Sequence, residues 1–501
     1  MKKLLAFILI ICTLFACACN TVPETVCTTH TDSDNNGACD VCSVSVIVTV
    51  DLYAINDLHG KFNDTDADEG VDELTTYLRR AQKTDDFAVL FASGDMWQGS
   101  SESNLTKGNI ITEWMNSLGV VGMTLGNHEF DWGEAAIEHN AELAEFPLLA
   151  INVFDKDTDK PVEYCAPSVV VTCGEIEIGI IGAIGDCYSS ISKDKVEDVY
   201  FKTGDELASL VKAESQRLRG EGVDVIVYSL HDGHDQSQNG AGVITDSALD
   251  SYYDPDLSLG GYVDIVFEGH THKNYTLVDS SGVYHLQNGG DNRGISHAEL
   301  DINFANGNLR VTEADFVPSA VYDMLEDDPI VAELLEKYKD EVAIGQTVLG
   351  HNAKKRSSGF IRQLVAQMYF EKGKELWGDE YDVVLGGGYI SIRSPYSLAA
   401  GEIQYSMLQS LLPFDNNLVL CSIKGYDLRR RFIESNNSNY FCAYDSDLPS
   451  LINNNETYYI IVDSYSSSYA PNRLTEITRY DADVFARDLI AEYVKQGGLE
   501  K

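Results

Sequence analysis

Five apolar segments of the sequence are each followed directly by side chains that commonly bind metal ions. The segments are residues 46–55, 87–92, 120–125, 223–230 and 263–267. The side chains that follow them are, in order, Asp57 and His59, then Asp95, then Asn127, then His231, and last His270 and His272. In α/β sheets functional groups gather beyond the carboxyl ends of strands, so we expect these five loops to meet at one site.

This set of ligands predicts the chemistry of the site. Imidazole together with carboxylate suits transition metals such as Zn, Mn, Co, Fe or Ni better than Ca or Mg alone. Seven groups exceed what one tetrahedral ion needs, and they suit two divalent ions that share a carboxylate. Two ions held about 3.5–4 Å apart activate a water molecule and clamp a phosphoryl group. Each motif alone is typical of an ordinary turn, but the five in series favour a metal site.

The same segments resemble a known family. The strings that carry the resemblance are Asn56-Asp57-Leu58-His59-Gly60, Gly94-Asp95-Met96-Trp97-Gln98-Gly99-Ser100, Gly126-Asn127-His128-Glu129-Phe130-Asp131, Ser229-Leu230-His231 and Gly269-His270-Thr271-His272. They are similar to the calcineurin-like metallophosphoesterases, in the branch of secreted 5'-nucleotidases, UDP-sugar hydrolases and 2',3'-cyclic-nucleotide phosphodiesterases. The resemblance spans roughly residues 47–495.

The resemblance implies a role for each metal-site residue. Asp57, His59 and His272 would hold one ion, Asn127, His231 and His270 the other, and Asp95 would bridge both. His128 would be the catalytic histidine that stabilises the phosphoryl oxygens, and Asp131 would orient it and keep it protonated. The nucleophile would be a hydroxide bridging the two ions, which makes the chain a metal-dependent phosphoric ester hydrolase.

The family match is weaker in the second half of the chain. There it implies that Phe414 and Tyr465 stack on the nucleobase and that Asn416 and Asn127 contact the substrate. The glycines at 386–388 resemble a glycine-rich loop that ends in a substrate-binding arginine, which points to Arg393, although four residues intervene. Arg356 is the other candidate. An aspartate that contacts the base in the family is absent here, and the alternative for Phe414 and Tyr465 is a core role.

Strands alternate with helices from residue 46 onward, which predicts an α/β fold. The family implies an N-terminal four-layer metallophosphoesterase domain, with β-sheets flanked by helices, over residues 46–320. A linker helix is expected over 321–342, and a smaller α/β C-terminal domain that binds the substrate over 343–501.

The 79 acidic and 36 basic side chains give a net charge of −43, which disfavours nucleic acid as a partner. A small nucleotide is an anion, so its binding site would need a local cluster of positive charge, from metal ions or arginines. The sequence does not predict an oligomeric state.

The first 19 residues resemble the signal peptide of a bacterial lipoprotein. Two lysines precede an apolar stretch too short to span a bilayer, and Cys17 follows Leu14-Phe15-Ala16 as in a lipobox. An ordinary cleaved signal peptide is the alternative. Both predict an exported protein, either anchored at the cell surface by a lipid on Cys17 or released into the periplasm or medium.

A Cys/His/Asp-rich tether over residues 20–45 carries a second candidate metal site. Cys27, His30, Cys39 and Cys42 have the spacing of a small zinc knuckle, which predicts a structural Zn ion. A disulfide plus a free thiol is the alternative, because the expected compartment is oxidising.

The leading function that the metal-site motifs and the family resemblance imply is hydrolysis of extracellular nucleotides. A cyclic-nucleotide phosphodiesterase, a UDP-sugar hydrolase and a surface binding protein without turnover are the alternatives.

Overall fold

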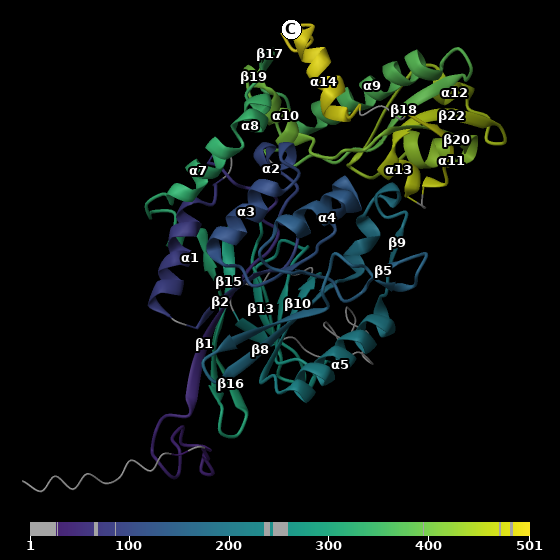
Figure 1. Cartoon of the computed structure of the whole chain (residues 1–501). Helices are drawn as coiled ribbons and strands as arrows, with labels where there is room; N and C mark the ends of the chain where they lie inside the picture. The colour runs from purple at the N-terminus through teal and green to yellow at the C-terminus, as the bar shows by residue number, and fades with distance from the viewer. Residues whose placement is uncertain are drawn as a thin grey trace, which may run out of the picture.

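A computed structural model describes residues 27, 29–64, 69–85, 87–234, 241–243, 259–393, 395–469, 472–480 and 484–500. Figure 1 shows an N-terminal domain in purple to teal with a C-terminal domain in green and yellow above it. The predicted Cys17 lies outside the described residues. Among the residues that are described, no helix is long and apolar enough to cross a membrane.

The N-terminal domain is built on two sheets that face each other. The six-stranded sheet has the order β16 (Asn308–Pro318), β15 (Gly294–Asn303), β1 (Ile47–Ile55), β2 (Ala88–Ala92), β3 (Met123–Thr124), β4 (Leu148–Leu149). The seven-stranded sheet has the order β11 (Ala241–Val243), β13 (Tyr275–Val278), β14 (Tyr284–Gln287), β12 (Ile265–Glu268), β10 (Val225–His231), β8 (Ile176–Ile184), β7 (Ser168–Cys173). One apolar core joins them, in which the rings of Phe91 and Phe267 meet edge to face at 5.0 Å.

Helices cover the outer faces of both sheets. On the six-stranded sheet lie α1 (Asp72–Thr84) and α3 (Asn109–Leu118). Their apolar sides, which include Leu74 of α1 and Trp114 of α3, are buried in one core. On the seven-stranded sheet, α5 (Gly204–Glu221) buries Val211 and Leu218. These layers confirm the predicted four-layer α/β fold.

Smaller elements complete the domain: α2 (Ser101–Leu105), η1 (His128–Trp132), α4 (Glu134–Leu143), η2 (Asp186–Ser190), η3 (Lys193–Lys195), and a three-stranded sheet of β6 (Lys160–Pro161), β5 (Val153–Asp155) and β9 (Val199–Phe201).

The segment between the domains differs from the single helix predicted over residues 321–342. A short turn η5 (Ser319–Val321) is followed by two helices, α7 (Pro329–Lys337) and α8 (Lys339–Gly345). The first begins at Pro329 because Asp328 accepts a hydrogen bond from the backbone N–H of Ile330 and the proline suits the first helical position. The helices also pack on the N-terminal domain, where Lys337 pairs with Glu113 at 2.5 Å.

The C-terminal domain is an α/β layer of its own, as predicted. Its sheet has the order β21 (Tyr440–Tyr444), β18 (Val383–Tyr389), β22 (Thr457–Asp463), β20 (Leu418–Lys424), β23 (Thr475–Arg479). Helices α9 (Ser358–Trp377) and α14 (Ala486–Lys495) share a core with one face of it. On the other face lie α11 (Gly425–Leu428), η6 (Arg429–Ile433) and α12 (Leu448–Leu451). The pair β17 (Val348–Asn352) and β19 (Gly401–Gln404), with α10 (Tyr405–Leu411) and α13 (Ser464–Ser468), completes the domain.

The three glycines at 386–388 lie within β18 instead of forming the predicted loop. A Cβ on Gly386 would come within 2.2 Å of the backbone of Phe370 in α9, and one on Gly387 within 2.1 Å of the carbonyl oxygen of Phe441 in β21. The glycines therefore allow a helix and a neighbouring strand to approach β18 closely.

An ion pair between a buried aspartate and an exposed lysine joins the two domains. Asp415 of the C-terminal domain accepts Lys107 Nζ of the N-terminal domain at 2.6 Å and also pairs with Arg487. Burial opposes charge on Asp415, but Arg487 and Lys107 outweigh it and lower the pKa of this carboxyl below its usual value. Since Asp415 follows Phe414 in sequence, the contact fixes the position of Phe414 relative to the N-terminal domain.

Candidate active site

The five predicted loops meet at the carboxyl ends of β1, β2, β3, β10 and β12. In the first group of side chains, the Nε2 atoms of His59 and His272 are 3.0 Å apart, and His272 Nε2 is 3.2 Å from Asp57 Oδ1. His59 Nδ1 lies 2.9 Å from the carbonyl oxygen of Gln98 and donates to it. That bond leaves the lone pair on His59 Nε2, directed at the other members of the group.

The second group lies beside the first. His231 Nε2 is 3.1 Å from Asp95 Oδ2, and His231 Nδ1 donates to the carbonyl oxygen of Ser93 at 2.7 Å. His270 Nδ1 and Asn127 Oδ1 are 2.9 Å apart. The carboxylate of Asp57 forms one compact set with His59 and His272 and another with Asp95 and His231. The structure therefore brings all seven predicted ligands together, and Asp57, instead of the predicted Asp95, is the carboxylate common to these two sets.

These residues fit two divalent cations. The Nε2 atoms of His59 and His272 face each other, an arrangement that a shared cation stabilises. Asp57, His59, Asp95, His270 and His272 all have positive φ angles, between 50° and 71°. Non-glycine residues rarely adopt this conformation, and such strain clusters at functional sites. The backbone is thus held in a costly form that points the ligands inward, which matches an O/N site for transition metals.

His128 lies beside the metal-site residues without joining either set. Its Nδ1 is 2.8 Å from Asp131 Oδ2, and its Nε2 is 2.6 Å from Nη2 of Arg393 in the C-terminal domain. Burial opposes charge on His128, but the carboxylates of Asp131 and Asp95 outweigh it, so the pKa of His128 is raised above its usual value. Asp131 therefore holds the imidazole in one orientation, with Nε2 directed into the space between the domains, where the Arg393 guanidinium can donate to it.

Glu129 is a structural residue of the site for which the sequence predicted no role. Its buried carboxylate accepts four backbone N–H groups, from Asp95 at 2.9 Å, Met96 at 2.8 Å, Trp97 at 3.3 Å and Gly126 at 2.6 Å. Glu129 therefore joins the loop after β2 to the loop after β3. Its place in the string Gly126-Asn127-His128-Glu129 was the only signal in the sequence.

One pocket connects His128 with the C-terminal domain. Of the predicted substrate residues, Asn127, Arg393, Phe414, Asn416 and Tyr465 all line it. The Phe414 ring lies 5.9 Å from that of His128, and the Arg393 guanidinium lies 5.6 Å over the Phe414 ring. Tyr389, Ser190, Ser192 and Asp463 also line the pocket and were not predicted. Burial raises the pKa of Asp463 to about 6.

Arg356 does not line this pocket, so its prediction as a substrate contact is wrong. The side chain is buried in the C-terminal domain, where it donates to Asn352 Oδ1 at 3.1 Å and to the carbonyl oxygen of Leu499 at 3.2 Å. It also lies 4.5 Å over the ring of Phe360. Arg356 therefore ties the end of the chain to the domain core. A basic cluster in the sequence does not distinguish such a role from phosphate binding.

Comparison with known proteins agrees with this geometry. Residues 51–274, which contain all seven metal-site residues and His128, match the model of the calcineurin-like phosphoesterase family. The match identifies the N-terminal domain as a calcineurin-like phosphoesterase domain. The chain is thus a metal-dependent phosphoester hydrolase, with divalent metals as cofactors.

Relatives extend the similarity to the C-terminal domain. The chain is 26% identical to an apyrase of Tabanus yao over 76% of this chain and 72% of the apyrase. It is 25% identical to a 5'-nucleotidase of Diplobatis ommata over 76% of this chain and 70% of the relative. The crystal structure of a 5'-nucleotidase precursor from Thermus thermophilus shares the fold, with a TM-score of 0.65, 18% identity, and coverage of 90% of this chain and 96% of that one.

The first prediction concerns the metal ions. Asp95→Asn should lower the catalytic metal content below two ions per chain, because the substitution removes a buried negative charge beside His231. The difference in metal content between wild type and variant, measured by elemental analysis, gives the number of catalytic ions lost. Metal held at the four Cys and His residues near the N-terminus cancels in that comparison. Equal metal content in the two proteins would refute the assignment.

The second prediction concerns His128. His128→Ala should lower kcat by ~10²–10⁴-fold, the effect expected for a positioned acid or electrostatic group. Metal content should stay at the wild-type value because His128 belongs to neither ligand set. Steady-state kinetics and elemental analysis on one preparation test both statements. Loss of metal in this variant would make His128 a ligand and would contradict its assignment as the catalytic histidine.

Proposed function

We propose that this chain is an exported hydrolase of nucleotides, of the 5'-nucleotidase type, with two divalent transition-metal ions at its catalytic site. The observation that carries the proposal is the single pocket in which His128 and Asn127 face Phe414 and Tyr465. One end of this pocket suits a phosphoryl group and the other suits a flat organic ring. Relatives named as 5'-nucleotidase and apyrase span both domains, which supports the same conclusion.

The metal end of the pocket supplies the hydrolytic chemistry. Two ions held by Asp57, His59, Asp95, Asn127, His231, His270 and His272 would provide Lewis acidity and activate water. Asp131 accepts the Nδ1 proton of His128, and a phosphoryl oxygen bound between His128 Nε2 and Arg393 Nη2 would accept hydrogen bonds from both groups. Arg393 adds a second positive charge at the same point, 2.6 Å from His128 Nε2. These two cations form the local positive focus that a chain of net charge −43 needs to bind an anion.

The side of the pocket that the C-terminal domain forms would bind the base. Phe414 follows Pro413 and is held by the ion pair of Asp415. Tyr465 is the second residue of α13, and its ring lies 5.7 Å from the ring of Tyr389. Stacking on such rings tolerates any base, since every base has a π-face. Asn416 offers a polar contact beside them. We therefore expect broad use of nucleoside monophosphates. A 2',3'-cyclic nucleotide or a UDP-sugar remains the alternative substrate of the same site.

The third prediction tests this recognition. Phe414→Ala should raise KM for nucleoside monophosphates about tenfold, since stacking on an aromatic ring contributes ~1–3 kcal/mol per base. Activity on p-nitrophenyl phosphate or its bis-ester should change little, because those substrates need only the metal end of the pocket. The measurement is the ratio of nucleotide to nitrophenyl turnover, over a panel that includes cyclic nucleotides and UDP-sugars.

The control is Tyr426→Ala, which removes an exposed aromatic ring on α11 outside the residues that line the pocket. It should leave the ratio at the wild-type value. If Phe414→Ala also left the ratio unchanged, Phe414 would be a packing residue, and the C-terminal domain would recognise something other than a base.

The fourth prediction concerns export. We propose that Cys17 is lipidated and anchors the chain to a membrane, on the basis of the sequence before it. Cys17→Ser should move the protein from the membrane fraction to the soluble fraction, because a single acylated cysteine is the attachment that the sequence indicates. Fractionation and immunoblotting of wild type and variant test this. A variant still in the membrane fraction would rule out the lipid anchor.

A further inference from the structure

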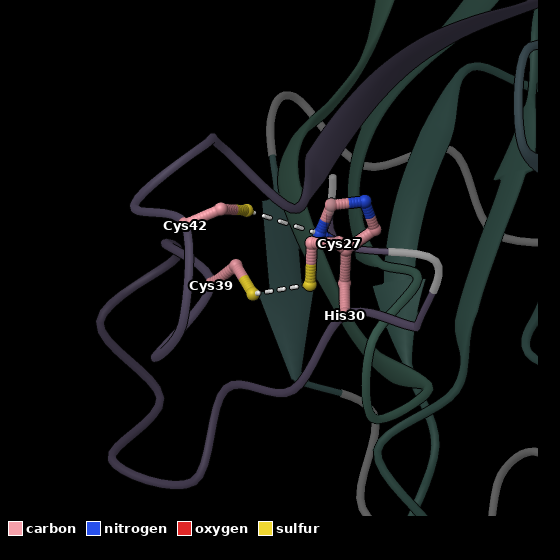
Figure 2. Close-up of side chains that lie close together, drawn as sticks. All are labelled: Cys27, His30, Cys39 and Cys42. Carbon is pink, nitrogen blue, oxygen red and sulfur yellow. Dashed lines mark hydrogen bonds between the residues drawn. The ribbon is translucent and has the colours of Figure 1, made fainter. Parts of the chain in front are cut away.

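A second cluster of metal-binding side chains lies far from the active site. Cys27, His30, Cys39 and Cys42 come from a loop that precedes β1, and their sulfur and imidazole nitrogen atoms all lie within 4.8 Å of one another. Figure 2 shows the three sulfur atoms and the His30 ring converging on one point. In Figure 1 this loop lies beyond the start of β1, at the end of the molecule opposite the C-terminal domain.

We propose that these four residues form a structural zinc site, which we call the zinc knuckle. Tetrahedral bonds of about 2.3 Å to sulfur and about 2.0–2.1 Å to nitrogen place two sulfurs about 3.8 Å apart and a sulfur and a nitrogen about 3.6 Å apart. The Sγ atoms of Cys27 and Cys39 are 3.7 Å apart, and Cys42 Sγ is 3.5 Å from His30 Nδ1. Both distances match edges of a zinc tetrahedron.

The donor set favours zinc over calcium and magnesium. Three thiols and one imidazole are soft ligands that suit Zn and not Ca or Mg. Four protein ligands close the coordination sphere, which is typical of structural zinc and leaves no open position for a substrate. A disulfide would use two of the sulfurs and leave the third thiol and the imidazole without a role. All three cysteines are free thiols in the structure.

The surrounding loop is built to hold the four ligands in place. The carboxylate of Asp32 accepts the backbone N–H groups of Asn36 at 3.0 Å and Gly37 at 2.9 Å, which closes the turn between His30 and Cys39. Around Cys39, its own N–H donates to the carbonyl oxygen of Val44 at 2.8 Å, and its carbonyl oxygen accepts the N–H of Ser43 at 2.8 Å. Such outer contacts fix the orientation of metal ligands.

The knuckle is also docked on the N-terminal domain. Asp32 accepts Asn303 Nδ2 at 2.6 Å, and the Asn35 side-chain oxygen accepts Nδ2 of Asn306 at 2.8 Å and of Asn308 at 2.9 Å. The His30 ring meets the ring of Phe304 edge to face at 5.6 Å. Zinc would therefore fasten the segment before β1 to the turn between β15 and β16. The nine residues of β1 separate it from Asp57 by roughly 30 Å.

The test uses the full-length protein after removal of metal by a chelator and addition of Co²⁺, which gives a sulfur-to-cobalt charge-transfer absorption only with thiolate ligands. We expect this absorption in the wild type, its loss in Cys39→Ser and Cys42→Ser, and its retention in Cys187→Ser. Cys187 is the matched control because its thiol lies beside His231 and His270 in the catalytic site. Zinc content before chelation should fall by one ion per chain in Cys42→Ser.

Hydrolysis of p-nitrophenyl phosphate should persist in Cys42→Ser, which shows that the rest of the chain is folded. In the wild type a second measurement needs no variant: alkylation of Cys27, Cys39 and Cys42, followed by mass spectrometry. Zinc predicts that these thiols react only after chelator is added. Reaction that requires a reductant would establish a disulfide, and immediate reaction without chelator would establish free thiols. Either result, or a wild type without the cobalt band, would overturn the proposal.

Discussion

The concentration of acidic and imidazole side chains at the carboxyl ends of five strands is the constraint on which the N-terminal domain depends. Asp57 and Asp95 are fully buried within reach of four histidines, and burying such groups is costly unless cations or hydrogen bonds compensate. The protein meets this cost with a rigid frame. Packing between the two sheets fixes the strand ends, and Glu129 is hydrogen-bonded to two of the loops. Five of the ligands are held at positive φ. A looser frame would let the loops relax and the site disperse.

The C-terminal domain adds what the metal centre lacks. The segments after β18 and α10 bring Arg393 and Phe414 to His128, so a site built in one domain gains a second cation and an apolar wall from the other. The ion pair of Lys107 with Asp415 holds this contact beside the pocket. Because the pocket walls come from both domains, any change in the angle between the domains alters base recognition and the surroundings of His128 together.

The zinc knuckle illustrates the same physics on a smaller scale. A loop this short buries little apolar surface, so a metal ion or disulfide is the usual means of fixing it. Here the ligands are thiols and an imidazole, whereas the catalytic centre uses carboxylates, an amide and imidazoles. This difference in ligand type distinguishes a closed structural site from a catalytic site that is open to substrate.

The sequence alone determined the chemistry, because ligand types and their positions after apolar segments are local properties. Asp57, Asp95, His231 and their partners could be named from spacing. The α/β fold followed from alternating strands and helices, and its four layers were implied by the family resemblance. Only the tertiary structure decided which residues distant in the sequence contact one another. Arg393 and Arg356 are both arginines near the expected place, yet packing brings one to His128 and ties the other to Asn352 and Leu499. The glycines at 386–388 resembled a loop, but the close approach of α9 and β21 makes them part of a strand. Such outcomes depend on contacts between segments distant in sequence, which no local pattern records.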